Sequence, residues 1–234
     1  MDRPRIALLN AAYDGTSTRQ NFRRELDADL VEFDAASGEL PESFEYDAVV
    51  VTGSRASVYW DDPWIPPLKE WVGEAIGREI PCLGVCYGHQ LLADVLGGEV
   101  RDMGEYELGY REVTHVGDSP LFSGIDERFT VFTSHSDEVT SLPPGAEPTA
   151  ENDVSNHGFR KGNVFGVQFH PEYDTETARA IAEGKRGAVP DDQLEAVLAG
   201  ITEENYAAAC EAKGVFENFT QYVRDQRLRP TAAD

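Results

Sequence analysis

The sequence predicts an α/β fold in which a mostly parallel central sheet lies between two layers of helices. Short apolar runs that end in turn-forming residues, at Arg5–Asn10, 46–54 and 80–87, are typical of buried strands. Segments with helical periodicity separate these runs. Alternating strands and helices imply parallel pairing through right-handed crossovers, and strands that are apolar on both faces imply helices on both sides of the sheet.

The first part of the chain alternates strand and helix in order. The strand at Arg5–Asn10 precedes a helical pattern over residues 18–30, and the strand at 46–54 precedes one over 66–79. The second helical pattern begins with two prolines, which fit the first turn of a helix. The third apolar run, 80–87, passes directly into another helical pattern.

The character of the chain changes between residues 99 and 169. Segments 107–116, 128–139 and 163–174 read as strands separated by Gly, Pro and Asn, with few helical patterns between them. We therefore expect a small antiparallel portion built onto the parallel sheet.

The end of the sequence returns to helical patterns, at residues 175–184, 191–201 and 203–227. A chain of 234 residues is long enough for one main core. We expect a main domain over residues 1–185 and a C-terminal helical extension, residues 186–234, packed on the same domain.

The composition is strongly acidic, with 43 Asp and Glu against 20 Lys and Arg, a formal net charge of -23. This charge repels phosphate backbones and anionic lipid headgroups, so neither nucleic acid nor a membrane is an expected partner. The acids are scattered and lysine is scarce, which favours a halophilic source whose cytoplasmic salt screens self-repulsion. An ordinary acidic cytosolic protein is the alternative.

Cysteine usage indicates a reducing compartment. Three cysteines are an odd number and too few for a disulfide framework. The apolar stretch near the N-terminus, residues 6–9, is too short for a signal peptide, and no stretch is long and apolar enough to span a bilayer. A cytoplasmic location is therefore expected.

One cysteine lies in a setting suited to catalysis. The stretch GVCYG, residues 84–88, has the form Gly-x-nucleophile-x-Gly at a strand-to-helix junction. Glycines suit the flanking positions because side chains there would collide with neighbouring backbone, and the helix N-terminus favours the thiolate form of Cys86. Cys82, inside the strand, is expected to be a buried apolar residue.

A thiolate nucleophile also needs a base and an orienting acid, which can come from far away in sequence. The stretch GVQFHPEY, residues 166–173, supplies both. His170 follows the end of a strand that Pro171 stops, and Glu172 is near enough to fix the tautomer of the imidazole. Three other histidines lack a comparable setting, His115, His135 and His157, while His89 lies on the helix that follows Cys86.

Taken together, GVCYGHQ and GVQFHPE, in this order and separation, resemble the class I (triad) glutamine amidotransferases over residues 5–173. The resemblance implies a three-layer, flavodoxin-like glutaminase domain over residues 1–185. It also implies hydrolysis of the L-glutamine side-chain amide through a thioester on Cys86, with proton transfer by His170, orientation by Glu172 and no cofactor.

The resemblance implies further site residues. The oxyanion hole would use the backbone N–H groups of Tyr87 and Gly53, and a glycine at the end of a parallel strand permits such a close approach. A plain strand-to-loop turn also explains Gly53. Gln90, Ser134 and Asp137 would contact the substrate, although a polar turn ending a strand explains the last two nearly as well.

The loop GSRASVYW after Gly53 resembles the free-standing, GMP-synthase-like type of this family. The sequence shows no P-loop and no second α/β unit, so an acceptor step that uses ATP would require a separate synthetase subunit. No metal is expected at Cys82, Cys86 and His89, because they lack the paired spacing of zinc ligands.

Two alternative functions stay open. A γ-glutamyl peptide hydrolase would use the same triad, and a catalytically silent binding or regulatory module would use the C-terminal helices as an interaction surface. The presence of Cys86, His170 and Glu172 together favours an enzyme.

Overall fold

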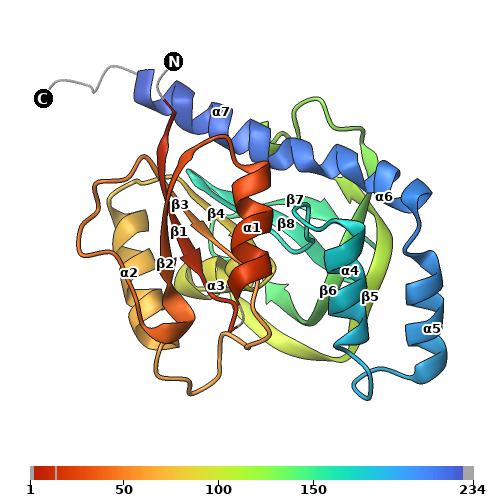
Figure 1. The fold of residues 1–234 in the computed structure, drawn as a ribbon. Coiled ribbons are helices and arrows are strands. Elements are labelled where there is room, and N and C mark those ends of the chain that lie inside the picture. Colours follow the sequence, from red (N-terminus) through yellow and green to blue (C-terminus); the bar gives the residue numbers. More distant parts are fainter. Residues whose placement is uncertain (1–2, 14, 229–234) are drawn as a thin grey trace, which may run out of the picture.

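A nine-stranded sheet forms the centre of the computed structural model, which describes residues 3–13 and 15–228 (Figure 1). The strand order is β2-β1-β3-β4-β9-β8-β7-β5-β6. Three pairs of consecutive strands are separated in the sheet by other strands: β2 and β3, β4 and β5, and β6 and β7.

Five strands at one side of the sheet are parallel to one another. They are β2 (Asp29–Asp34), β1 (Arg5–Asn10), β3 (Ala48–Val51), β4 (Cys82–Val85) and β9 (Val164–Val167). The carboxyl ends of parallel strands meet at one edge of a sheet, where ligands bind in open α/β folds. The loops after β3, β4 and β9 therefore converge.

The other four strands add an antiparallel half, which contains β8 (Asn156–Lys161), β7 (Glu147–Glu151), β5 (Glu99–His115) and β6 (Arg128–Ser141). The long β5 and β6 form a twisted ribbon at the edge of the sheet (Figure 1). The predicted α/β class with a parallel sheet and an antiparallel portion is confirmed.

Helices cover both faces of the sheet. One face packs against α1 (Gly15–Glu25) and α7 (Gly214–Leu228), and the other packs against α2 (Ile65–Gly77) and α3 (Tyr87–Val95). Along β1, alternate side chains pack into the cores on the two sides of the sheet, because successive residues of a strand point to opposite faces. This arrangement is the three-layer architecture predicted from the strands that are apolar on both faces.

The segment 18–30, predicted as one helical pattern, contains the end of a helix and the start of a strand. The helix α1 ends at Glu25, and the chain returns to the sheet as β2 from Asp29. The N–H of Asp29 donates to the carbonyl of Pro4 at 2.9 Å, which starts the pairing of β2 with β1. Sheet pairing thus overrides a pattern that also fits a helix.

Three further helices follow the sheet in the chain: α4 (Thr175–Glu183), α5 (Asp191–Gly200) and α6 (Glu203–Ala209). Side chains of α4 and α5 pack with Leu108 and Phe132 of the β5 and β6 ribbon. A 3-10 turn separates α6 from α7, so the helical pattern over 203–227 is divided. Residues 229–234 of the expected C-terminal extension lie outside the described residues.

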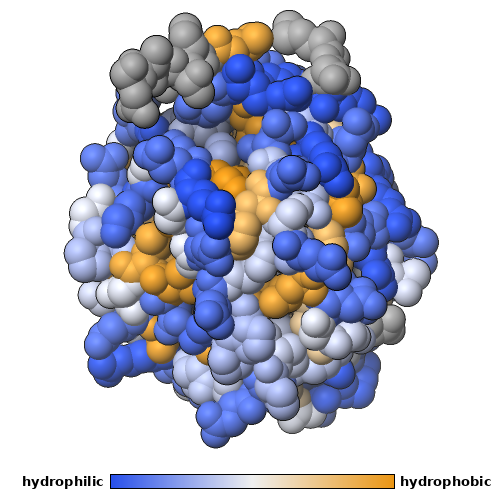
Figure 2. All heavy atoms as spheres, turned by 90° about the vertical axis from the view of Figure 1, so that its left-hand side faces the viewer, coloured by the Kyte–Doolittle hydropathy of each residue, from blue (hydrophilic) through white to orange (hydrophobic). Residues whose placement is uncertain are grey.

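The face of the molecule drawn in Figure 2 is largely hydrophilic. Figure 2 shows the face at the β2 edge, where hydrophobic residues form small separate patches among hydrophilic ones. Among the described residues, the exposed large hydrophobic side chains are Tyr13, Tyr59, Trp60, Val154 and Leu228. No helix in the described part of the chain has both the length and the apolarity needed to cross a bilayer.

Candidate active site

Cys86 occupies a strained turn between β4 and α3. Its φ of 52° and ψ of -103° place a non-glycine residue in a region that costs about 1–3 kcal/mol. Two backbone hydrogen bonds hold it there: its N–H donates to the carbonyl of Val167 at 2.8 Å, and its carbonyl accepts from the N–H of Gln90 at 3.1 Å. The turn is therefore fixed by both the sheet and the helix.

The glycines on each side of Cys86 are needed for close backbone packing. A Cβ added to Gly84 would lie 2.2 Å from the carbonyl oxygen of Gly88. A Cβ added to Gly88 would lie 2.3 Å from the carbonyl oxygen of Val51. Neither neighbour can move without breaking the sheet or the helix, which is the physical reason for the Gly-x-Cys-x-Gly spacing.

His170 lies after β9, and its backbone N–H donates to the carbonyl of Phe132 on β6 at 2.9 Å. Its Nδ1 is 2.8 Å from Oε1 of Glu172, and its Cε1 lies on the same side of Gly53 as Cβ of Cys86. Burial alone would lower the pKa of His170, but the Glu172 carboxylate and the neighbouring Cys86 raise it to about 10. The sequence-predicted nucleophile, base and acid thus come together, with both His170 and Glu172 buried.

Two residues that the sequence analysis missed support this group. The ring of Tyr173 stacks on the His170 imidazole, with centroids 4.1 Å apart and an interplanar angle of 11°. Arg24 of α1 donates from Nη2 to the Glu172 carbonyl at 2.6 Å and from Nη1 to Oδ2 of Asp174 at 2.9 Å. These contacts fix the loop that carries the imidazole.

The two residues expected to form an oxyanion hole flank the thiol. A Cβ added to Gly53 would lie 2.8 Å from Cε1 of His170 and 3.6 Å from Cβ of Cys86, so the backbone of Gly53 lies close to both side chains. Tyr87 is the first residue of α3, and its side chain is fully buried against Trp64. Backbone of both residues therefore lies beside Cys86.

A cavity of about 120 Å³ opens at Cys86. The loop after β3 contributes Ser54, Arg55, Ala56, Ser57 and Trp60 to its wall, and the remaining walls come from Gln90, Tyr106, Ser134, His135, Ser136, Asp137 and Lys185. All three residues predicted to contact substrate therefore line one cavity with the thiol.

The contacts of these three residues differ. Gln90 is buried, and its Nε2 donates to the carbonyl of Asp137 and to Oε1 of Gln168, both at 3.0 Å. Oδ1 of Asp137 accepts from the hydroxyl of Tyr59 at 2.9 Å, and the carbonyl oxygen of Ser134 is 4.0 Å from the Cys86 sulfur. The amide nitrogen of Gln90 thus holds the cavity wall together.

A second cavity, of about 200 Å³, lies on the His170 side of the site. Its lining includes Gly53, His170 and Tyr173 together with Tyr13 and Ile181. Arg55, Ser134 and Lys185 line both cavities. Cys86 and His170 therefore each face a cavity, and the two cavities share part of their walls.

The other thiol and imidazole near the elbow are unsuited to catalysis. Cys82 is fully buried, and burial raises the pKa of its thiol to about 12. Burial lowers the pKa of His89 to about 3, so this ring is neutral. Within the described residues, the group whose ligand atoms lie close enough to share a metal ion is Glu107, His135 and His157, which the sequence analysis did not identify.

Residues 11–183 match the family model described as glutamine amidotransferase class-I. Because this match covers well over half of the sequence, the chain belongs to the class I glutamine amidotransferase family. The predicted resemblance is confirmed.

The chain is also similar in sequence to individual proteins of known name. The chain is 41% identical over 125 residues to a GMP synthase (glutamine-hydrolyzing) of Thermomicrobium roseum, covering 53% of this chain and 23% of the relative. It is 36% identical over 168 residues to that of Thermus thermophilus, covering 67% of this chain and 32% of the relative. The chain thus spans about a quarter to a third of the length of these relatives.

A solved structure has a similar fold over nearly the whole chain. The crystal structure of a glutamine amidotransferase from Thermotoga maritima superposes with a TM-score of 0.79 at 25% identity, covering 94% of this chain and 100% of the other. The expected GMP-synthase-like type fits the relatives named above.

Proposed function

We propose that the protein hydrolyses the side-chain amide of L-glutamine and supplies the ammonia for an amidotransferase reaction. One observation carries this proposal: buried His170 connects the thiol of Cys86, held at a strained elbow, to the carboxylate of Glu172. Family membership and the names of the GMP synthase relatives support the same reaction.

In the first half-reaction, the Cys86 thiolate attacks the amide carbon, and the resulting oxyanion accepts hydrogen bonds from the N–H groups of Gly53 and Tyr87. His170 gives its proton to the leaving nitrogen as the carbon–nitrogen bond breaks. Ammonia leaves, and a γ-glutamyl thioester stays on the sulfur.

In the second half-reaction, His170 takes a proton from water, and the hydroxide attacks the thioester carbon. The carbon–sulfur bond breaks, glutamate is released, and the thiolate and imidazolium are restored. Glu172 keeps the imidazole in position and stabilises its charged form in both halves.

The glutamyl part of the substrate is proposed to occupy the cavity lined by Gln90, Ser134 and Asp137. The Asp137 carboxylate suits the α-ammonium group, and Arg55 and Lys185 at the same cavity suit the α-carboxylate. Ammonia would pass to an ATP-dependent synthetase unit outside residues 1–234, in line with the GMP synthase relatives, which extend well beyond the aligned part.

The direct test is glutamate release from L-glutamine by the purified protein, assayed alone and with candidate synthetase partners. We expect release by the wild type and none by Cys86→Ala. A wild type that releases no glutamate under either condition would contradict the proposal.

A second candidate, a γ-glutamyl peptide hydrolase, is favoured by the cavity of about 200 Å³ beside His170 and Gly53, which has room for a leaving group larger than ammonia. Comparison of kcat/KM for L-glutamine and for γ-glutamyl dipeptides separates the two candidates. Faster turnover of the dipeptides would identify the protein as a γ-glutamyl peptide hydrolase.

A catalytically silent module is tested by covalent labelling of Cys86 with a glutamine-like diazo-ketone. In a silent module this thiol would not react.

A further inference from the structure

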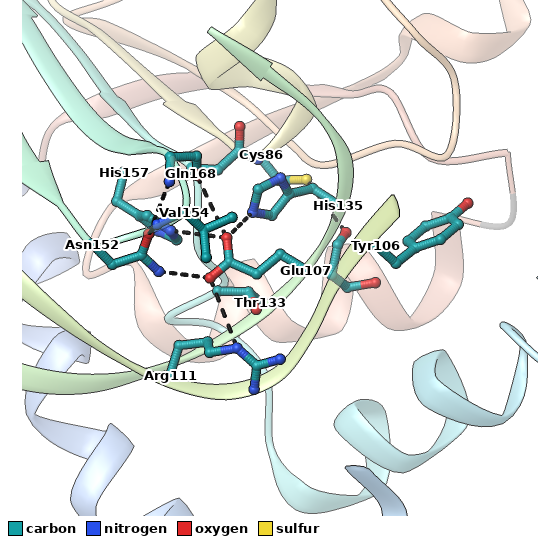
Figure 3. Close-up of polar contacts among 12 residues, drawn as sticks. Cys86, Tyr106, Glu107, Arg111, Thr133, His135, Asn152, Val154, His157 and Gln168 are labelled. Atoms are coloured by element: carbon teal, nitrogen blue, oxygen red, sulfur yellow. Dashed lines mark hydrogen bonds and ion pairs between the residues drawn. The ribbon is translucent and has the colours of Figure 1, made fainter. Parts of the chain in front are cut away.

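A buried carboxylate lies directly behind the wall of the glutamine cavity. Glu107 of β5 is 3% exposed and pairs across the ribbon with His135 of β6. Figure 3 shows the side chains that converge on it. A buried ionised carboxylate is costly unless it is paired and fully hydrogen-bonded, so each of its contacts matters.

Both oxygens of this carboxylate accept hydrogen bonds. Oε2 lies 2.8 Å from Nε2 of His135 and 3.1 Å from Nε2 of His157, and the Ser155 hydroxyl donates to it at 3.5 Å. Oε1 accepts from Nδ2 of Asn152 at 2.6 Å and lies 3.9 Å from Nε of Arg111. Burial alone would raise the pKa of the Glu107 carboxyl, but the two histidines lower it, which keeps the group charged.

The contacts of His135 show where this pairing acts. Its Nε2 faces Glu107, and its Nδ1 lies 2.9 Å from the backbone carbonyl oxygen of Asp137. The ring therefore links the Glu107 carboxylate directly to the backbone of the segment that ends at Asp137. The same Asp137 carbonyl also accepts from Nε2 of Gln90.

We infer that Glu107 is a positioning residue for the glutamine cavity, which acts through His135 on the segment from Ser134 to Asp137. That segment supplies the carbonyl that lies 4.0 Å from the Cys86 sulfur and the side chain that binds Tyr59. Glu107 itself is not part of the cavity lining. This inference rests on the proposed glutaminase function.

A metal ion is the competing explanation, since Glu107, His135 and His157 each offer an atom within 4.8 Å of the others. Two observations favour hydrogen bonds among these three residues over a shared metal ion. Nδ1 of His157 has no hydrogen-bond partner among the described residues, so metal on Nε2 would leave a buried, unpaired N–H there. The guanidinium of Arg111 lies 3.9 Å from Oε1 of Glu107, and its positive charge would repel a cation at this carboxylate.

The test variant is Glu107→Gln, which keeps the size of the side chain and removes its charge. We expect KM for glutamine to rise about tenfold or more, since misplacing one polar contact of a bound substrate costs on the order of 1.4 kcal/mol. Because the thiol and its base are untouched, kcat and the rate of Cys86 alkylation by iodoacetamide should stay within about threefold of wild type.

Glu112→Gln is the matched control. Glu112 lies on the same strand and pairs with Arg128 of β6 at 3.5 Å, but this pair is exposed and far along the ribbon from the cavity. We expect wild-type KM and kcat for this variant. If Glu107→Gln unfolds at the assay temperature, His157→Gln changes a partner of the same carboxylate that does not line the cavity, and it should raise KM in the same selective way.

Calorimetric binding of glutamine to Cys86→Ala, with and without Glu107→Gln, separates this inference from the proposed function. Weaker binding only in the double variant supports the positioning role. Equal affinity in both would overturn it, and so would one equivalent of bound zinc whose removal raises KM. A failure of Cys86→Ala to bind glutamine would instead contradict the proposed function.

Discussion

The imidazole of His170 stacks on the ring of Tyr173, with centroids 4.1 Å apart and planes inclined by 11°. The stacking restricts rotation of the imidazole about its side-chain bonds, while Glu172 fixes the direction of Nδ1. Geometry of this kind matters because displacement of a catalytic base by about 1 Å can reduce a rate about 100-fold.

We therefore predict that Tyr173→Ala lowers kcat for glutamine about tenfold, because the imidazole gains freedom to leave its reactive position. Tyr173→Phe is the matched variant, since it keeps the aromatic face and loses only the hydroxyl. Its kcat should stay within about threefold of wild type. An equal loss in both variants would show that the hydroxyl, not the stacked ring, is important.

The raised pKa of His170 predicts a broad alkaline range of activity. The pKa of the imidazole is raised from 6.5 to about 10, so the ring stays charged up to about pH 10. The alkaline decrease of kcat/KM should therefore occur near pH 10. Because the pKa is raised on folding, the associated stability is fully present below pH 6.5 and is lost as the pH rises through about 10.

In Glu172→Gln the carboxylate that raises this pKa is gone, so the alkaline limb should move to lower pH. The pH profile of kcat/KM measures the shift directly. Glu176→Gln, an exposed change of the same chemistry on α4, should leave the limb where it is. An unmoved limb in Glu172→Gln would show that this carboxylate does not stabilise the imidazolium.

The contact of Gly53 predicts that Gly53→Ala damages catalysis more than folding. Its new methyl group would lie 2.8 Å from Cε1 of His170, which displaces the ring and the backbone donor, so kcat should fall about 100-fold. Gly77→Ala, which meets nothing within 4 Å at the end of α2, should keep wild-type kcat and gain about 0.5 kcal/mol in the free energy of unfolding. Steady-state kinetics and urea unfolding of both variants test this contrast.

The net charge of -23 predicts that salt stabilises the protein. Repulsion among scattered surface acids is screened within about 10 Å at 0.1 M salt and within about 3 Å at 1 M. The melting temperature should rise by roughly 5 °C between these concentrations of KCl. A melting temperature that falls or stays constant would contradict the halophilic interpretation.

The sequence was most informative where a function depends on local backbone. The elbow at Cys86 and the group at His170 could be predicted because their glycines, proline and strand ends lie within a few residues of the reactive atoms. The parallel sheet could be predicted for a similar reason, since buried strands such as β3 are short and uniformly apolar.

The unpredicted parts depend on pairing between distant segments. His135 and His157 gave no signal in the sequence, because their shared partner Glu107 comes from another strand and is aligned with them only by the register of β5 and β6 and the position of β8. Arg24 was missed similarly, since its target lies 148 residues away on the loop after β9. The boundary between α1 and β2 was missed because local periodicity does not encode sheet pairing.

The most direct test of the account is the covalent intermediate on Cys86. Protein mixed with L-glutamine is quenched in acid within a turnover, and the modified peptide is located by mass spectrometry. We predict one γ-glutamyl group on Cys86 of the wild type, with accumulation of this adduct reduced in His170→Asn and none in Cys86→Ala. Glutamate formed at the wild-type rate by Cys86→Ala, or an adduct on another residue, would contradict the account.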